Sequence, residues 1–178
     1  MRVRKNVLLT GMITLAAVSI LLAGCTDMRD AKPVIYLYPE QTQEVSVQLE
    51  LDGKLTCAYP EYGSGWRVKA YPDGTLLDQD TGKKYNYLFW EGTSGTGYDL
   101  SRGFVVEGKD TAEFLEEKLA YLGLNERESN EFIVYWLPRM EENNYNLITF
   151  QGEKYTEHAK LKISPEPDSI LRVFMVYK

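Results

Sequence analysis

The stretch Glu44-Val45-Ser46-Val47-Gln48-Leu49-Glu50-Leu51 decides the fold class, because its polar and apolar residues alternate without a break. Successive side chains of a β-strand point to opposite faces. The four aliphatic residues would therefore share one face, and the serine, the glutamine and the glutamates the other. This pattern predicts a half-buried antiparallel strand with one face in water.

Further strands are predicted on both sides of this stretch. Each is a short run rich in β-branched and aromatic residues and is bounded by residues that favour turns. The expected strands cover residues 34–38, 55–59, 66–70, 75–77, 84–90, 103–107, 132–137, 145–150, 159–163 and 170–177. Asp52-Gly53 indicates a hairpin turn between the strand at 44–51 and the strand at 55–59.

Helical patterns are confined to the middle of the chain. Asp110 and Glu113 have capping-box spacing, apolar residues recur on one helical face through residue 122, and Gly123 provides a stop. Asn125 with Glu128 is a second cap signal and predicts a short helical turn through about residue 130. The apolar run at 132–137, with Pro138 behind it, favours a strand. We expect an α+β fold, mainly antiparallel β and sandwich-like, with one helix and a short helical turn inserted.

The first residues are organised as an export signal. Three basic residues precede an uncharged, mostly apolar run that extends to residue 24. Leu22-Ala23-Gly24-Cys25 resembles the lipobox, where signal peptidase II cuts bacterial lipoproteins. The resemblance implies acylation of Cys25 and a stable lipid anchor. An uncleaved membrane-spanning anchor is the alternative, since the run is near the 18 residues such a span needs.

On this interpretation the chain has three parts. Residues 1–24 form a lipoprotein signal peptide, residues 25–32 a lipidated tether, and residues 33–178 a single β-rich extracytoplasmic domain. The lipid would lie in the outer leaflet of the plasma membrane or in an outer membrane. Either location places the domain outside the cytoplasm.

Charge and cysteine content exclude several classes of partner. Three of the 20 basic residues and none of the 26 acidic residues precede Cys25, so the remainder has a net charge of −9. An acidic domain is a poor candidate for binding nucleic acid, and we expect it to contact the membrane through its lipid alone. With Cys25 acylated, Cys57 has no disulfide partner, and its place in the alternation predicts a small buried side chain.

No motif points to a cofactor or a metal ion. His158 is the single histidine, whereas zinc sites use several histidine or cysteine ligands. A catalytic histidine also needs a nucleophile beside it. We therefore expect no cofactor and no metal, and a histidine that is exposed or half-buried.

Aromatic and polar residues around two loops are the candidates for ligand binding. One loop covers residues 60–65, and the other is the glycine-rich stretch at 91–99. Exposed aromatic rings can stack on sugars or fill the hot-spot pocket of a partner protein. An inter-strand loop without a ligand is the plainer alternative. The candidates are Tyr59, Tyr62, Trp66, Trp90, Tyr98 and Arg102.

A carboxylate pair would indicate a different class of function. A glycosidase needs two carboxyl groups about 5–9.5 Å apart, one of them with a raised pKa beside apolar surface. Glu91 directly follows two aromatic residues, and either Asp99 or Glu61 could be its partner. With 26 acidic residues in the chain, such a pairing also arises easily by chance.

Three stretches carry a resemblance to a known family. Lys32-Pro33-Val34-Ile35-Tyr36-Leu37-Tyr38-Pro39, Tyr87-Leu88-Phe89-Trp90-Glu91-Gly92 and Tyr135-Trp136-Leu137-Pro138 together resemble a family of uncharacterised exported bacterial proteins. The similarity would span about residues 32–178, and it implies no functional residue.

The sequence as a whole predicts a lipid-anchored lipoprotein of the cell envelope. Its domain is expected to be a non-catalytic binding domain for an envelope protein or polysaccharide. A surface hydrolase that uses the carboxylate pair and a purely structural lipoprotein remain the alternatives.

Overall fold

The computed structural model describes residues 28–30, 32–94 and 97–178. The predicted signal peptide and the lipobox with Cys25 lie outside the described residues. In the part of the chain that is described, no helix is long and apolar enough to cross a membrane. The described chain is mainly antiparallel β-sheet with a few short helices, and this confirms the predicted α+β, sandwich-like fold.

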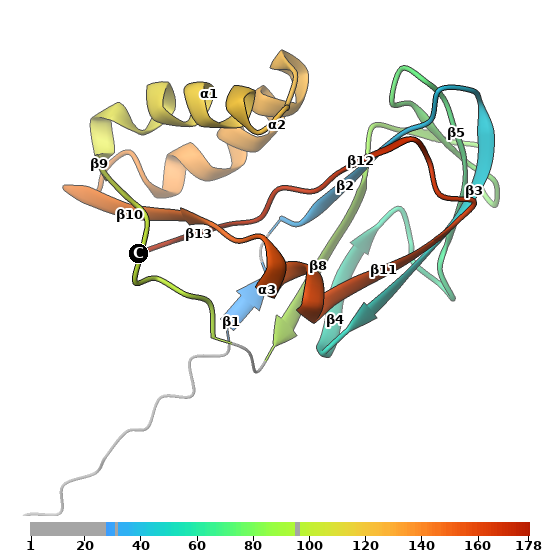
Figure 1. Ribbon diagram of the computed structural model, residues 1–178, viewed down its shortest axis with the longest axis horizontal. Coiled ribbons are helices and arrows are strands. Elements are labelled where there is room, and N and C mark those ends of the chain that lie inside the picture. The colour runs from blue at the N-terminus through green and yellow to red at the C-terminus, as the bar shows by residue number, and fades with distance from the viewer. Residues whose placement is uncertain (1–27, 31, 95–96) are drawn as a thin grey trace, which may run out of the picture.

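Two five-stranded sheets face each other and form the sandwich (Figure 1). The first sheet has the order β11-β3-β5-β6-β7. It consists of β3 (Gln43–Leu51), β5 (Trp66–Ala70), β6 (Leu76–Asp78), β7 (Lys84–Tyr85) and β11 (Ala159–Ser164). In the second sheet β8 pairs with β4 along one edge and with β2 and β1 along the other, and β12 pairs with β2. This sheet consists of β1 (Met28–Asp30), β2 (Val34–Tyr38), β4 (Gly53–Tyr59), β8 (Leu88–Ser94) and β12 (Ser169–Leu171).

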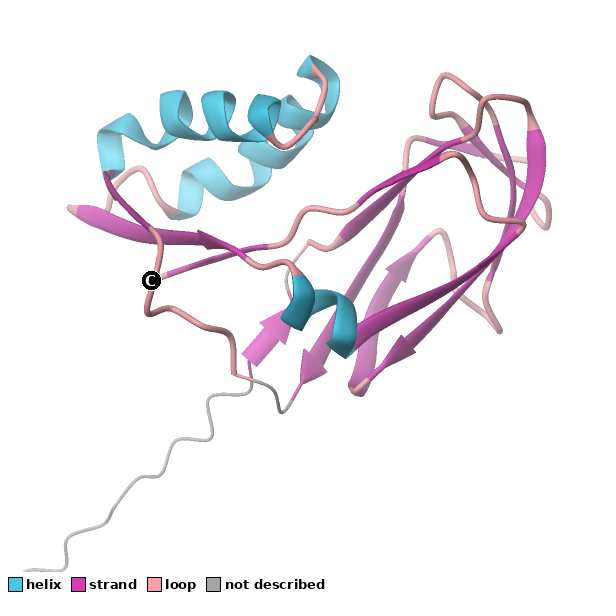
Figure 2. Ribbon diagram, in the orientation of Figure 1, coloured by secondary structure: helices cyan, strands magenta, loops and turns pink. Residues whose placement is uncertain are grey.

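A smaller sheet with two helices stands beside the sandwich (Figure 2). Its order is β13-β10-β9, from β9 (Phe104–Glu107), β10 (Tyr145–Phe150) and β13 (Met175–Tyr177). The helices are α1 (Thr111–Tyr121) and α2 (Glu126–Trp136), flanked by the 3-10 turns η1 (Gly108–Asp110) and η2 (Leu137–Arg139). A third helix, α3 (Glu153–His158), leads into β11.

Each of these two parts has its own hydrophobic core. The sandwich core contains Val45, Val47 and Trp66 from one sheet, and Ile35 and Trp90 from the other. The second core joins residues of both helices to the inner face of the small sheet. The alternation that predicted β3 is therefore confirmed, since its valines are buried and its polar residues exposed.

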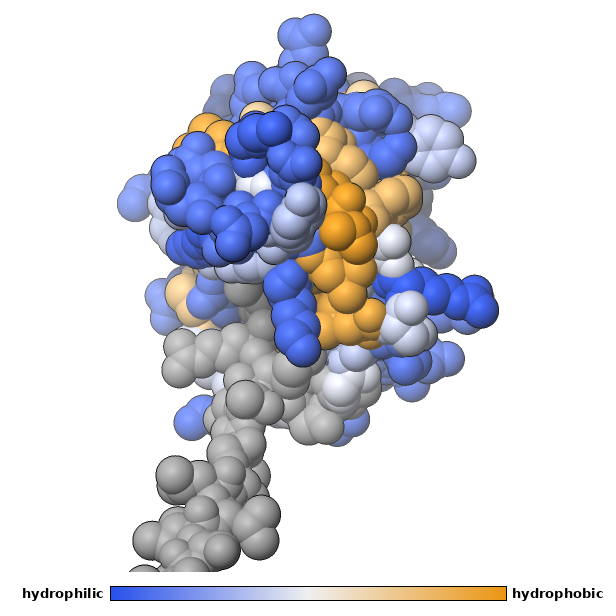
Figure 3. Space-filling model, turned by 90° about the vertical axis from the view of Figure 1, so that its left-hand side faces the viewer, coloured by the Kyte–Doolittle hydropathy of each residue, from blue (hydrophilic) through white to orange (hydrophobic). Residues whose placement is uncertain are grey.

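The small sheet leaves its outer face open. Val106 and Ile148 pack against the helices, so their neighbours in the alternation, Val105 and Leu147, lie on the opposite face. Val105 is 72% exposed. Figure 3 views the molecule from the left-hand side of Figure 1 and shows apolar side chains gathered in one patch.

The hairpin predicted at Asp52-Gly53 does not form. β3 pairs with β11 and β5, whereas β4 pairs with β8 in the other sheet. The backbone N–H of Asp52 donates to the carbonyl of His158 at 2.9 Å, so the end of β3 is held by the chain entering β11. Residues 52–53 therefore carry the chain from one sheet to the other.

The prediction that Cys57 is buried is wrong. The register between β4 and β8 shifts between Leu55 and Cys57, which is the signature of a β-bulge. Beyond the bulge the alternation is displaced by one residue, so Leu55 and Ala58 pack on the sandwich core. Cys57 and Tyr59 are consequently exposed.

Residues 132–137 are helical, so the strand predicted there is wrong. Asn125 and Glu128 form the predicted capping box, with both of its hydrogen bonds, but the helix it opens continues to Trp136. Its buried residues include Ser129, Phe132, Ile133 and Trp136, the spacing of one helical face. The capping box predicted for α1 is not formed, because Asp110 belongs to η1 and its side chain makes no cap hydrogen bond.

Other expected elements differ in extent. Residues 84–90 are divided between β7 and β8, and residues 170–177 between β12 and β13. β8 continues through residues 91–94, which were expected to be part of a loop. Residues 28–30, which were assigned to the tether, pair with β8 as β1. The helix α3 was not predicted.

Candidate functional site

Three of the six predicted binding residues belong to the core. Trp66, Trp90 and Tyr98 are buried. The indole N–H of Trp66 donates to the carbonyl of Pro60 at 2.9 Å, and the ring of Tyr98 packs on that of Phe174 with centroids 4.9 Å apart. These side chains hold the sandwich together and present no stacking surface.

The loop aromatics separate into one fixed residue and one exposed residue. The ring of Tyr62 meets Trp66 edge-on at 4.7 Å, and its hydroxyl accepts from the Leu49 N–H at 2.8 Å. Tyr62 thus closes the end of β3, where strand pairing with β5 has stopped. Tyr59, by contrast, is 60% exposed, so the structure keeps it as a candidate binding residue.

The predicted carboxylates have different partners. Glu91 lies on β8 near Tyr135 of α2, whose pKa is raised by burial first and then by the charge of the Glu91 carboxylate. Asp99 accepts from the backbone N–H of Ser101 at 2.8 Å, and this hydrogen bonding holds its pKa below the usual range. A general acid needs the opposite shift. Glu61 is exposed in the loop after β4.

Arg102 is exposed and lines a surface hollow with Asp99 and Gln151. The side-chain amide of Gln151 donates to the carbonyl of Asp99 at 3.0 Å. This hollow is therefore formed by the segment before β9 and the segment after β10. Arg102 belongs to a different neighbourhood from Tyr59, which stands on β4.

A second hollow surrounds Tyr59, and we call it the Tyr59 hollow. Its volume is about 510 Å³. The rings of Tyr59 and Tyr85 meet almost at right angles, with centroids 5.3 Å apart. The hollow exists because β7 ends at Tyr85 and the chain bends at residues 86–87 before it re-enters the other sheet as β8. It is lined by Tyr59, Lys83, Lys84, Tyr85, Asn86 and Tyr87.

Five of these six residues were missed as site residues. The stretch Lys84-Tyr85-Asn86-Tyr87-Leu88-Phe89-Trp90 reads as one continuous aromatic strand, whose alternate residues would be buried. Asn86 in its middle was the available signal, because asparagine is depleted in strands and common at bends.

Asn86 connects the Tyr59 hollow to a polar cluster beside α2. The side-chain amide of Asn86 donates to a carboxylate oxygen of Glu131 at 3.2 Å. The ammonium group of Lys32 donates to the Glu131 carbonyl and lies 5.0 Å from the ring centroid of Tyr135. Tyr87 meets Tyr36 edge-on at 5.6 Å. The three stretches that carry the family resemblance therefore come together at this cluster.

Burial and the Glu131 carboxylate shift the pKa values in this cluster. Burial is the main cause for Tyr36 and Tyr87, whose pKa values are raised, and the charge of Glu131 adds to it. Burial lowers the pKa of Lys32, against the opposite effect of Glu131. Both phenols are protonated at neutral pH, as a phenol with the ordinary pKa near 10 would also be. Of the two, only Tyr87 lines the Tyr59 hollow, where its phenol can donate a hydrogen bond to a polar ligand.

The raised pKa of Tyr36 predicts a change in alkaline stability. The unfolded phenol ionises near pH 10, whereas the buried phenol resists ionisation, so its contribution is complete below pH 10 and is lost as pH rises further. In urea unfolding between pH 10 and 12, Tyr36→Phe should reduce the fall in stability by about 1.4 kcal/mol per pH unit. Tyr121→Phe, at an exposed site on α1, should leave the slope unchanged. An unchanged slope in Tyr36→Phe would contradict the assignment.

No group of three or more histidine, cysteine, aspartate or glutamate side chains could hold a metal ion among the residues that the structure describes. His158 lies at the end of α3 and is buried, whereas we expected it to be exposed or half-buried. Its position beside the start of β11 makes it part of the packing between α3 and the first sheet.

Comparison with known proteins gives one informative relative. No protein-family model matches the chain, and no solved structure matches it. An uncharacterised protein in the bglA 3′ region of Butyrivibrio fibrisolvens is 44% identical over 80 residues, which are 40% of this chain and 81% of that protein. Because the match covers most of the relative, the chain belongs to the same family as this Butyrivibrio fibrisolvens protein.

Proposed function

We propose that this protein is a lipid-anchored binding domain of the cell envelope that holds an anionic polysaccharide in the Tyr59 hollow. The observation that carries the proposal is the composition of the hollow, where three tyrosines, two lysines and an asparagine surround about 510 Å³. This size lies within the usual range of ligand sites, about 300–1,000 Å³.

The lining suits the chemistry of a charged sugar chain. The C–H faces of a sugar ring pack on exposed aromatic rings such as Tyr59, and the sugar hydroxyls can exchange hydrogen bonds with Asn86 and the phenols. Carboxylate or phosphate groups on the chain would meet Lys83 and Lys84. Two adjacent lysines stand out in a chain whose net charge is −6.

The anchor belongs to the same proposal. Acylation of Cys25 would hold the domain at the outer face of a membrane, within reach of envelope polymers. The acidic balance of the domain supports a lipid anchor over electrostatic adsorption to anionic lipid. The lining of the Tyr59 hollow is open, and the pKa of Asp99 is lowered. Both observations favour binding over the carboxylate-based hydrolysis considered above.

Tyr59→Ala should weaken the binding of polygalacturonate about tenfold, since truncating an aromatic anchor typically costs more than 1 kcal/mol. Affinity electrophoresis of the full-length protein measures this binding, and dextran serves as the uncharged polymer for comparison. Binding should fall as salt rises, because the lysines act through charge.

The anchor is tested separately in the cells that express the protein. There, Cys25→Ser should move the protein out of the membrane fraction and leave polygalacturonate binding intact.

Tyr145→Ala is the matched control, because Tyr145 is 61% exposed and lies on β10 of the small sheet. Equal binding by Tyr59→Ala, Tyr145→Ala and the unaltered protein would overturn the site. Shortening of the polymer during incubation, abolished by Glu91→Gln, would replace binding with hydrolysis. If neither the unaltered protein nor the two variants bind any polymer, a structural lipoprotein would be favoured.

A further inference from the structure

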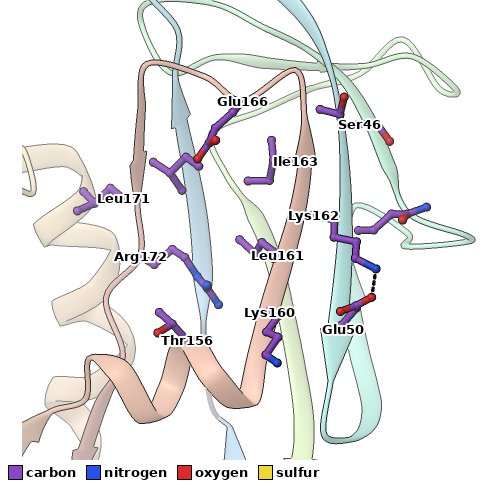
Figure 4. A pocket seen from close by; sticks show the side chains of 13 residues that line it. Ser46, Glu50, Thr156, Lys160, Leu161, Lys162, Ile163, Glu166, Leu171 and Arg172 are labelled. Carbon is purple, nitrogen blue, oxygen red and sulfur yellow. Dashed lines mark ion pairs between the residues drawn. The ribbon is translucent and has the colours of Figure 1, made fainter.

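A hollow opens between β11 and β12 (Figure 4). These strands are joined by the turn at residues 165–168, yet β11 pairs with β3 in one sheet and β12 with β2 in the other. They diverge from the turn, and α3 closes the other end of the gap. The resulting groove has a volume of about 1030 Å³.

One wall of the groove is the unpaired edge of β11, the first strand in its sheet order. The His158 carbonyl accepts from Asp52 at the end of β3, whereas the next carbonyl, that of Ala159, turns away and accepts from Arg172 at 2.7 Å. Because peptide groups alternate along a strand, those of Lys160 and Lys162 face β3. Those of Leu161 and Ile163 face the groove.

The groove also exposes part of the sandwich core. Leu161 and Ile163 pair with core-facing residues of β3 and are only partly buried, although they lie on the core-facing side. Ile170 of β12 is partly buried in the same way. An additional strand beside β11 would cover these three side chains and pair the free peptide groups of Leu161 and Ile163.

The charged residues of β11 indicate which kind of strand could add to its edge. The outer face of β11 carries Lys160 and Lys162, both exposed, with Glu50 as an ion-pair partner of Lys162. A second copy of β11 would place lysines against lysines, which is unfavourable between neighbouring strands. A strand with carboxylates on its outer face and aliphatic residues on its inner face would complement both sides of β11.

We propose that the groove receives an extended acidic segment of a partner protein, which adds to β11 as a further strand. Backbone hydrogen bonds to Leu161 and Ile163 would supply affinity, and the alternating side chains would supply specificity, as in other cases of strand addition. The six residues of β11 would span about 20 Å. This site is separate from the Tyr59 hollow and takes a different class of ligand.

The test uses a capped seven-residue peptide that alternates glutamate with valine, and a counterpart that alternates lysine with valine. Fluorescence anisotropy with the full-length protein should show binding of the glutamate peptide only. Ile163→Pro removes one groove-facing N–H, a change that edge strands tolerate, and should weaken binding about five- to tenfold. Ile163→Val keeps the N–H and should bind as the unaltered protein does.

Two further measurements distinguish a loss of peptide binding from the misfolding of a variant. Lys160→Glu combined with Lys162→Glu changes only exposed residues and should reverse the preference between the two peptides. Amide hydrogen exchange should show Leu161 and Ile163 becoming protected when the glutamate peptide binds, while Lys160 and Lys162 are protected throughout. Equal binding of both peptides, or no added protection at Leu161 and Ile163, would overturn the proposal. Binding that is lost in Tyr59→Ala would also overturn it.

Discussion

Trp90→Ala should lower the free energy of unfolding by about 3–5 kcal/mol, the usual cost of deleting a large buried aromatic side chain. Trp90 is fully buried on β8, and its ring lies parallel to that of Tyr155 with centroids 6.4 Å apart. Tyr155 stacks in turn on Phe174 at 4.6 Å. The substitution would remove one end of a three-ring stack that connects β8, α3 and the segment before β13.

Urea unfolding followed by circular dichroism measures this effect. Tyr59→Ala is a useful comparison, because its side chain is exposed on β4, the neighbour of β8, and it should cost less than about 1 kcal/mol. Trp90→Phe should fall between the two, since it keeps a ring in the stack. A loss below about 1 kcal/mol in Trp90→Ala would mean that the core refills the space, contrary to the packing described.

Local patterns predicted most strands but few of their partners. The alternation of β3 and the turn residues around β5 and β6 are encoded within a few residues, so they could be recognised directly. Which strand pairs with β3 depends on contacts far along the chain. Its partner β11 lies more than 100 residues away, and β4, the next strand in sequence, belongs to the other sheet.

The helix α2 shows how two local signals can disagree. The β-branched and aromatic residues at 132–136 favour a strand, whereas the capping box at Asn125 favours a helix with no breaker before Pro138. The helical spacing was available as the decisive signal. Phe132, Ile133 and Trp136 are buried, while Val134 between them is 74% exposed, an arrangement that a strand cannot give.

The candidate site was predictable in only one residue. Tyr59 was identified from its place beside a loop. Its side chain is exposed because a β-bulge moves it to the outer face of the sheet, and the sequence gives no signal for that bulge. Burial of Trp66 and Trp90 depends on which sheet face meets the core. The meeting of Asn86 with Glu131, 45 residues apart, depends on α2 being a helix.

Gly108→Ala should destabilise the protein by about 3 kcal/mol, the upper end of the usual range for overpacked sites. A Cβ at Gly108 would lie 2.0 Å from the carbonyl oxygen of Asn143 and 2.5 Å from that of Glu141. Both atoms belong to the backbone between η2 and β10, so they cannot rotate away as a side chain would. The Gly108 N–H also donates to the Asn144 carbonyl at 3.3 Å, and this contact fixes the close approach.

The same crowding explains where the damage would appear. Gly108 follows β9 and begins the turn η1 into α1, so relief of the contact must separate β9 from β10 or move the helices from the small sheet. If the effect is local, Gly108→Ala should accelerate amide hydrogen exchange, relative to the unaltered protein, more in α1 than in β3. Gly97→Ala is the matched control, because a Cβ there meets nothing within 4 Å, and its stability should change by less than about 0.5 kcal/mol. Equal stability of the two variants would show that residues 141–143 can move aside, and that the small sheet and its helices do not depend on this contact.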